Sequence, residues 1–263
     1  MRPRAAALLV ALLLVAGALG LVLGREPEGG RLSLLETGPT SFDASIVSFD
    51  GVRIEATVYR PAGADASRPV PVVLHGHGWS GSRTTDGAGI VGRLWMEGFG
   101  VVSIDARGHG ASGGVATVQH RDHEVQDSRR VLDWVHDNLD WVRREPASGV
   151  PKDVVAGAVG ASYGGGFQLM LASHDARLDA IAPEIAWSDL NAALAPNGVP
   201  KSVWSDVLIG QAHARGTRFD PRIEQWHARR SSRTSTRPKR ARTSRTRRRA
   251  STPSARRRSS CRA

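Results

Sequence analysis

The pentapeptide Gly160-Ala161-Ser162-Tyr163-Gly164 has residue types and spacing that suit nucleophilic catalysis. A serine hydroxyl is exposed for attack when a tight turn from strand to helix pushes it out of a sheet, and glycines two residues before and after it avoid clashes there. The helix that follows aims its first amides at the same place. We therefore predict that Ser162 attacks a carbonyl carbon and carries an acyl group. The alternative is a glycine-rich turn with an incidental serine, in a chain with 29 glycines.

The negative charge that such an attack places on the carbonyl oxygen needs two hydrogen-bond donors. The backbone N–H of Tyr163 is one candidate, and the backbone N–H of His77, in the loop His75-Gly76-His77-Gly78, is the other. The imidazoles of His75 and His77 could instead bind a metal ion, and His120 and His123 form a second loose pair. No carboxylate or cysteine cluster completes either set. We therefore expect loop histidines that are held by hydrogen bonds, with no metal site and no cofactor.

A third motif, at residues 105–110 (DARGHG), is followed by Ser112-Gly113-Gly114. It also begins where an apolar run ends, which is where open α/β sheets place their sites. We interpret it as a structural loop that shapes a pocket, with Arg107 paired to a local partner, rather than as a catalytic element.

Each of these three motifs directly follows an apolar run that is typical of a buried strand. Asp50-Gly51 predicts an opening hairpin, and strand and helix signals alternate after it. This order predicts an α/β fold, with a mostly parallel sheet, helices on both faces and the motifs at the carboxyl ends of the strands. The predicted strands are residues 44–49, 52–59, 70–74, 101–105, 153–159 and 178–182, and the predicted helices are residues 88–97, 123–142 and 164–173.

The order of the three motifs resembles that of the α/β-hydrolase fold. Residues 160–169 (GASYGGGFQL) and 179–190 (DAIAPEIAWSDL), with residues 196–204 after them, are similar to the Xaa-Pro dipeptidyl-peptidase and cocaine-esterase-like serine hydrolases. The resemblance covers residues 44–228. It implies a serine hydrolase without cofactor that acts on peptides with proline at the second position, or on acyl esters or amides.

The same resemblance implies a cap over the site after the sixth core strand, and residues 186–228 look like its start. Trp79, Trp187 and Trp204 could line an apolar pocket there, or could simply pack. The family's catalytic acid and histidine come from strands after the cap. The histidines after Ser162 are His174, His213 and His227, and no further strand precedes any of them. No triad acid or base is therefore identified.

The positive charge of the chain is concentrated at one end. Residues 229–263 hold 15 of the 36 basic residues and none of the 25 acidic ones, so residues 1–228 carry 21 basic and 25 acidic residues, a net charge of −4. We interpret this low-complexity tail as out-of-frame translation, which leaves the hydrolase inactive as written. The alternative is a non-catalytic hydrolase-like module whose tail binds anionic surfaces. Nucleic acid is not expected as a partner, because the chain carries an export signal.

That signal is the uncharged run at residues 5–24, which follows Arg2 and Arg4 and ends before Arg25. It predicts a signal peptide or a membrane anchor within residues 1–24, and hence a protein that is secreted or held on the outer face of the cytoplasmic membrane. Residues 25–43 are predicted as a linker, 44–185 as the hydrolase core and 186–228 as a partial cap. The single cysteine, Cys261, excludes an internal disulfide. Nothing in the sequence indicates an oligomeric state.

Overall fold

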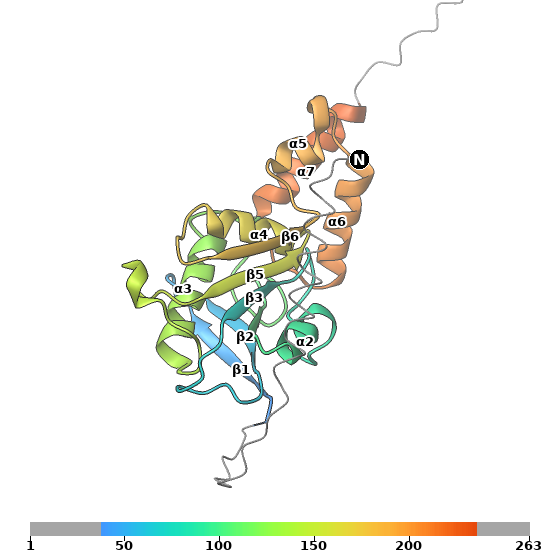
Figure 1. Ribbon diagram of the computed structural model, residues 1–263. Coiled ribbons are helices and arrows are strands. Elements are labelled where there is room, and N and C mark those ends of the chain that lie inside the picture. Colours follow the sequence, from blue (N-terminus) through green and yellow to red (C-terminus); the bar gives the residue numbers. More distant parts are fainter. Residues whose placement is uncertain (1–37, 236–263) are drawn as a thin grey trace, which may run out of the picture. The chain divides into compact units, whose positions relative to one another are not determined.

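The computed structural model describes residues 38–235, with side chains as far as Arg229 (Figure 1). The predictions for residues 1–24, for most of the linker at residues 25–43 and for most of the tail at residues 229–263 lie outside the described residues. Within the described part, no helix is long and apolar enough to cross a membrane.

The core is a six-stranded sheet in the order β1-β2-β4-β3-β5-β6. The strand β2 runs antiparallel to both β1 and β4, and the other neighbours pair in parallel. This confirms the predicted opening hairpin and the mostly parallel sheet, with strand ends displaced by a few residues. The strands are β1 (Thr40–Val47), β2 (Arg53–Arg60), β3 (Val72–Gly76), β4 (Gly100–Ile104), β5 (Ala156–Ala161) and β6 (Ala180–Glu184).

Helices cover both faces of this sheet, as predicted. The helix α2 (Gly89–Met96) lies on one face, where Val91 packs with Tyr59 and Val101. The helices α3 (Glu124–Asn138) and α4 (Tyr163–Ala172) cover the other face, where their apolar side chains join the main hydrophobic core with those of the strands. Alternate residues of each strand point to opposite faces, so both layers can be packed.

The helix predicted at residues 123–142 ends earlier, at Asn138. Leu139 is extended, with φ −111° and ψ 94°. The chain then runs beside the start of β3, where the Val70 N–H donates to the Trp141 carbonyl (2.9 Å) and the Arg143 N–H donates to the Val70 carbonyl (2.8 Å). The apolar residues that looked helical therefore continue into the core from an extended segment.

Three helices follow β6: α5 (Leu190–Leu194), α6 (Ser202–Ala214) and α7 (Pro221–Ser235). They are grouped together beyond β6 (Figure 1). The helix α7 spans the predicted boundary between residues 228 and 229 and includes the first seven residues of the basic segment. The Arg218 N–H donates to the Gly108 carbonyl, the Ala116 N–H donates to the Arg218 carbonyl, and a β-bridge joins Phe219 to Ala116. These contacts attach the segment between α6 and α7 to the loop after β4.

The strand β6 lies at the edge of the sheet in the described part of the chain. All five of its residues are exposed, and Ile185, which follows it, is 76% exposed. An edge of this kind offers backbone groups and apolar side chains to a further strand.

Candidate active site

Ser162 lies in the turn between β5 and α4, at the carboxyl end of the sheet, in the context that the sequence predicts. Its φ of 55° and ψ of −115° are a rare conformation for a residue with a side chain. Such strain persists only when the surroundings hold it. The Ser162 N–H donates to the Glu184 carbonyl, and the Ser162 carbonyl accepts from the N–H groups of Gly165 and Gly166, each at 2.9 Å. The turn is therefore fixed on both sides of the serine.

Gly160 and Gly164 allow this turn to rest directly on the end of β3. A Cβ at Gly160 would lie 2.2 Å from the Gly76 carbonyl oxygen, and a Cβ at Gly164 would lie 2.0 Å from the same atom. Gly160 also has a φ of +152°. The steric reason for both glycines, inferred from their spacing, is thus present in the structure.

The next two glycines have a structural reason that the sequence did not reveal. A Cβ at Gly165 would lie 2.8 Å from the Glu184 carbonyl oxygen, and a Cβ at Gly166 would lie 2.7 Å from the Trp187 ring. The first turn of α4 therefore packs against the chain that leaves β6. Trp187 covers this turn, and whether it also lines a substrate pocket stays a prediction.

The two amides predicted to bind an oxyanion come from chain segments in direct contact. Tyr163 is the first residue of α4, and His77 directly follows β3. A Cβ at Gly164 would lie 2.6 Å from the Gly76 carbonyl carbon and 3.0 Å from the His77 carbonyl oxygen. Within the described part of the chain, neither the Tyr163 N–H nor the His77 N–H donates to an acceptor. Their role as oxyanion donors stays a prediction.

The His77 imidazole is held in place as a neutral ring. Its Nε2 accepts from the Ala106 N–H (3.1 Å), so Nδ1 carries the proton and donates to the Gly78 carbonyl (2.8 Å). Burial lowers the pKa of His77. His75 bonds to the Ser103 hydroxyl at 2.8 Å, and burial lowers its pKa to about 4. The loop histidines are thus hydrogen-bonded, and the described residues hold no group of three or more side chains suited to a metal ion.

Trp79 is the centre of an aromatic cluster beside the serine turn. Its ring lies 5.3 Å from that of Tyr163, 5.2 Å from that of His109 and 6.0 Å from that of Phe219. Its Nε1 donates to the Leu208 carbonyl of α6 at 3.0 Å. Trp79 therefore connects the residue after Ser162 to the helices beyond β6. Trp204, by contrast, is 55% exposed on α6.

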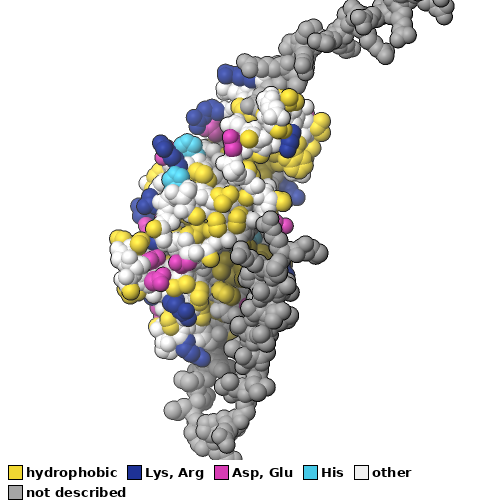
Figure 2. Space-filling model, turned by 45° about the horizontal axis from the view of Figure 1, so that its top comes forward, with side chains coloured by type: hydrophobic (Ala, Val, Ile, Leu, Met, Phe, Trp, Pro, Cys, Tyr) yellow, Lys and Arg dark blue, Asp and Glu magenta, His cyan; other side chains and the backbone are white. Residues whose placement is uncertain are grey.

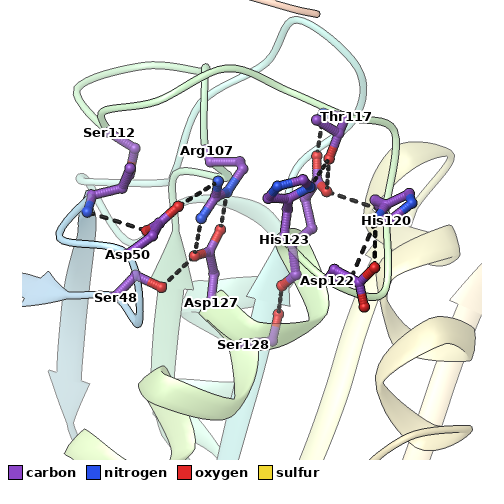
Figure 3. Close-up of polar contacts among 12 residues, drawn as sticks. Ser48, Asp50, Arg107, Ser112, Thr117, His120, Asp122, His123, Asp127 and Ser128 are labelled. Carbon is purple, nitrogen blue, oxygen red and sulfur yellow. Dashed lines mark hydrogen bonds and ion pairs between the residues drawn. The ribbon is translucent and has the colours of Figure 1, made fainter.

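Arg107 is paired with distant residues rather than with a local partner, which corrects the prediction. Its guanidinium donates twice to the Asp127 carboxylate of α3, at 2.6 and 2.7 Å, and once to Asp50 in the β1–β2 turn, at 3.1 Å (Figure 3). The Ser48 hydroxyl also donates to Asp127, at 2.5 Å. Burial lowers the pKa of Arg107, but Asp127 more than offsets this, so the pKa lies above its ordinary value. The loop at residues 105–110 is thus bonded through Arg107 to α3 and to the β1–β2 turn.

A second buried carboxylate, Glu124, fixes the loop that precedes α3. It accepts from the N–H and the hydroxyl of Thr117, each at 2.5 Å, and from the His120 N–H at 2.9 Å. The Tyr163 hydroxyl also donates to it, at 3.2 Å, and Gln119 Nε2 donates to the Tyr163 carbonyl at 3.1 Å. This loop is therefore hydrogen-bonded to Tyr163, the residue after Ser162, and no local sequence signal indicated these contacts.

A small cavity of about 40 Å³ lies behind the serine turn, among residues that include Arg107, Glu124 and Tyr163. This volume holds a few water molecules at most. Ser162 does not line it. The cavity is therefore too small for a substrate and lies among the residues that hold the loops around Ser162 in place.

All nine histidines of the chain lie within the described residues. His213 Nε2 lies 2.8 Å from Glu224, and His227 Nε2 lies 2.9 Å from Asp206, so both rings join α6 to α7. His174 bonds to Ser173 and to the Met170 carbonyl at the end of α4. In the part of the chain that the structure describes, the Ser162 hydroxyl has no hydrogen-bond partner.

A sheet with one reversed strand near its start, and a serine on a strained turn between the parallel strand β5 and the helix α4, define an α/β hydrolase. The family model for the X-Pro dipeptidyl-peptidase (S15 family) matches residues 50–260, and the chain belongs to this family of serine hydrolases. The match extends past Ala228 into the basic segment. It confirms the resemblance inferred from the motifs.

Two predicted serine esterases, from Mycobacterium bovis and Mycobacterium tuberculosis, are each 26% identical to the chain over 177 residues, which is 60% of this chain and 26% of theirs. The chain thus spans about a quarter of the length of these curated relatives. The crystal structure of a CocE/NonD family hydrolase from Staphylococcus aureus has a TM-score of 0.54, with 79% of this chain and 42% of that chain covered. At 18% identity, this likeness supports the fold alone.

Proposed function

We propose that Ser162 is the nucleophile of a hydrolase that cleaves peptide, ester or amide bonds through an acyl-enzyme. The observation that carries the proposal is the strained turn at Ser162, with the unused amides of His77 and Tyr163 beside it. The Ser162 oxygen would bond to the carbonyl carbon while the hydroxyl proton leaves to a base. The amine or alcohol of the substrate would then depart, and water would release the acyl group.

We further propose that the chain as written holds Ser162 in an unactivated state. A serine hydroxyl without a base is a weak nucleophile, and none of the nine histidines, all of which lie in the described part of the chain, bonds to the Ser162 hydroxyl. An oxyanion hole alone retains only traces of catalysis. Peptides with proline at the second position and acyl esters remain the two substrate classes, because both follow from the family.

Labelling of the full chain with a fluorophosphonate tests this proposal. We expect slow, incomplete labelling that maps to Ser162 by peptide mass spectrometry and disappears in Ser162→Ala. Ser173→Ala, which removes an exposed serine at the end of α4, is the matched control and should label as the parent does. Fast stoichiometric labelling of Ser162 would show that a base is present. A label on another residue would show that Ser162 is not the nucleophile.

The interpretation of residues 229–263 as out-of-frame translation remains a proposal with its own test. Resequencing the gene across the codons for Asp220 to Ser235, which include all of α7, would reveal a shifted frame. A restored frame that encodes apolar strands followed by Asp and His would support an active parent hydrolase. A confirmed basic tail with no continuing frame would favour the non-catalytic module.

Export is proposed on the sequence of residues 5–24 alone. N-terminal sequencing of the protein from an expressing cell would distinguish a cleaved signal peptide from a retained anchor, and an intact N-terminus in the cytoplasmic fraction would contradict export.

A further inference from the structure

Gln168 is a polar residue that points into the core from the second turn of α4, and its exposed fraction is 0%. Its neighbours on the same helix, Phe167 and Leu171, are apolar members of the main core. A buried amide loses free energy of hydration unless its hydrogen bonds are replaced. Its partners therefore indicate what the amide contributes.

Those partners lie on both sides of the nucleophile. Gln168 Nε2 donates to the Gly160 carbonyl at 3.0 Å and to the Gly164 carbonyl at 2.8 Å. Its Oε1 accepts from the Ala182 N–H of β6 at 2.9 Å. Carbonyl oxygens only accept and an amide N–H only donates, so this orientation of the side chain is unambiguous.

We propose that Gln168 is the positioning residue of the serine turn: its amide holds the strand before Ser162, the helix after Ser162 and the neighbouring strand β6 in one fixed arrangement. Gly160 and Gly164 are the residues two before and two after the nucleophile, so the amide joins the two ends of the strained segment. Gln168 does not touch the reacting atoms. Its expected effect on reactivity rests on the proposed function, whereas its effect on the geometry of the turn does not.

We call the three hydrogen bonds of the Gln168 amide, to Gly160, Gly164 and Ala182, the clamp. Its existence is tested by amide hydrogen exchange, measured by NMR on the full chain. Gln168→Met keeps the length of the side chain and removes all three bonds. We expect exchange at Ala182 to rise about tenfold or more, because its N–H loses its acceptor, together with faster exchange at Gly165 and Gly166. The matched control is Leu171→Ala, which removes a fully buried core side chain from the same helix and should leave Ala182 no faster than its β6 neighbours.

Gln168→Glu separates the two halves of the clamp, and serves if the methionine variant does not fold. Burial beside two carbonyl oxygens favours the protonated form of a glutamate here. That form keeps an oxygen for the Ala182 N–H but can donate to only one of the Gly160 and Gly164 carbonyls. We expect Ala182 to stay protected while Gly165 and Gly166 exchange faster. Unchanged exchange at all three residues, in either folded variant, would overturn the clamp.

The positioning role is tested by the rate of fluorophosphonate labelling at Ser162, at a temperature where circular dichroism shows each variant folded. We expect a loss of about tenfold or more in Gln168→Met and an unchanged rate in Leu171→Ala. Faster exchange with an unchanged labelling rate would overturn the positioning role. If the parent chain does not label at Ser162 at all, the proposed function fails, and the exchange measurement alone decides whether the clamp exists.

Discussion

The polar pairs around the Ser162 turn and those between the helices after β6 differ in how far they are exposed to solvent. Around the turn the partners are buried and lie far apart in the sequence, as in the pair of Arg107 and Asp127, whose side chains are 4% and 7% exposed. Between α6 and α7 the pairs are exposed: His213 and Glu224 are 59% and 48% exposed. Hydrophobic side chains also lie open on the part of the molecule formed by these helices (Figure 2), including Val203 at 75% exposed.

This difference indicates where the fold is rigid. Breaking a buried pair leaves an uncompensated charge and costs several kcal/mol, whereas exposed pairs contribute little. Ser162 therefore lies in the region whose polar groups are held by buried pairs, and α6 and α7 are joined to each other by exposed pairs that contribute less. Each of the following variants compares a change in one region with a matched change in the other.

Gly164→Ala should have the largest effect. Its Cβ would lie 2.0 Å from the Gly76 carbonyl oxygen, a backbone atom that cannot move away without displacing β3. We expect a loss of about 4 kcal/mol or more in the free energy of unfolding. The matched change Gly210→Ala, in α6, meets nothing within 4 Å and should stabilise by about 0.5–1 kcal/mol. Guanidinium denaturation measures both, and equal effects would contradict the comparison.

Arg107→Met should cost about 3 kcal/mol or more, because Asp127 would remain buried without its cation. The double variant Arg107→Met/Asp127→Leu removes both charges and should recover much of this loss. Urea denaturation of the single and double variants tests the interpretation. A single variant as stable as the parent would show that the pair is not held as described.

The pH dependence of stability should reflect His109. Burial lowers the pKa of this ring, which is 1% exposed, to about 4, whereas an unfolded histidine titrates near about 6.5. Between these values the unfolded chain binds the extra proton, so the free energy of unfolding falls as pH falls from about 6.5 to about 4 and this contribution is constant below. We expect a loss of up to about 3 kcal/mol.

His109→Phe should remove the His109 share of that acid dependence while keeping the aromatic contacts with Trp79 and Tyr163. The shares of His75 and His77, whose pKa values burial also lowers, should remain. His120→Gln, which removes a side chain 49% exposed, is the control and should leave the slope as in the parent. Thermal unfolding at a series of pH values gives the comparison. A slope in His109→Phe that is as steep as in the parent would contradict the contribution of His109.

The local structure around Ser162 could be predicted from the sequence, because the signals for it lie in neighbouring residues. The hydrogen-bond partners that hold this region could not. Strand, turn and helix around Ser162, and the glycines at 160 and 164, follow from neighbouring residue types. The partners of Arg107 lie 20 and 57 residues away, and those of Gln168 include a strand 14 residues on. No periodicity encodes such contacts, since they arise only when the sheet assembles. The end of α3 was misplaced for the same reason, because Trp141 and Arg143 form backbone hydrogen bonds with Val70, which precedes β3.

Ser162→Gly should stabilise the chain by about 1 kcal/mol, because glycine adopts the φ of 55° without strain. The same change at Ser173, which has an ordinary helical conformation, should destabilise by up to about 1 kcal/mol. Thermal unfolding of both variants measures the strain stored at the nucleophile. A Ser162→Gly variant that is less stable than the parent would mean that the turn holds no strain to relieve.

The smallest effect is expected across α6 and α7. His227 and Asp206 lie 2.9 Å apart, but the carboxylate is 61% exposed, so solvent screens the pair. A double-mutant cycle with His227→Gln and Asp206→Asn should give a coupling energy below about 1 kcal/mol, measured by urea denaturation at low salt. The same cycle on Arg107 and Asp127 should give a coupling several times larger. A coupling at His227 that equals that of the buried pair would mean that α6 and α7 are held to each other as firmly as the segments around the serine turn.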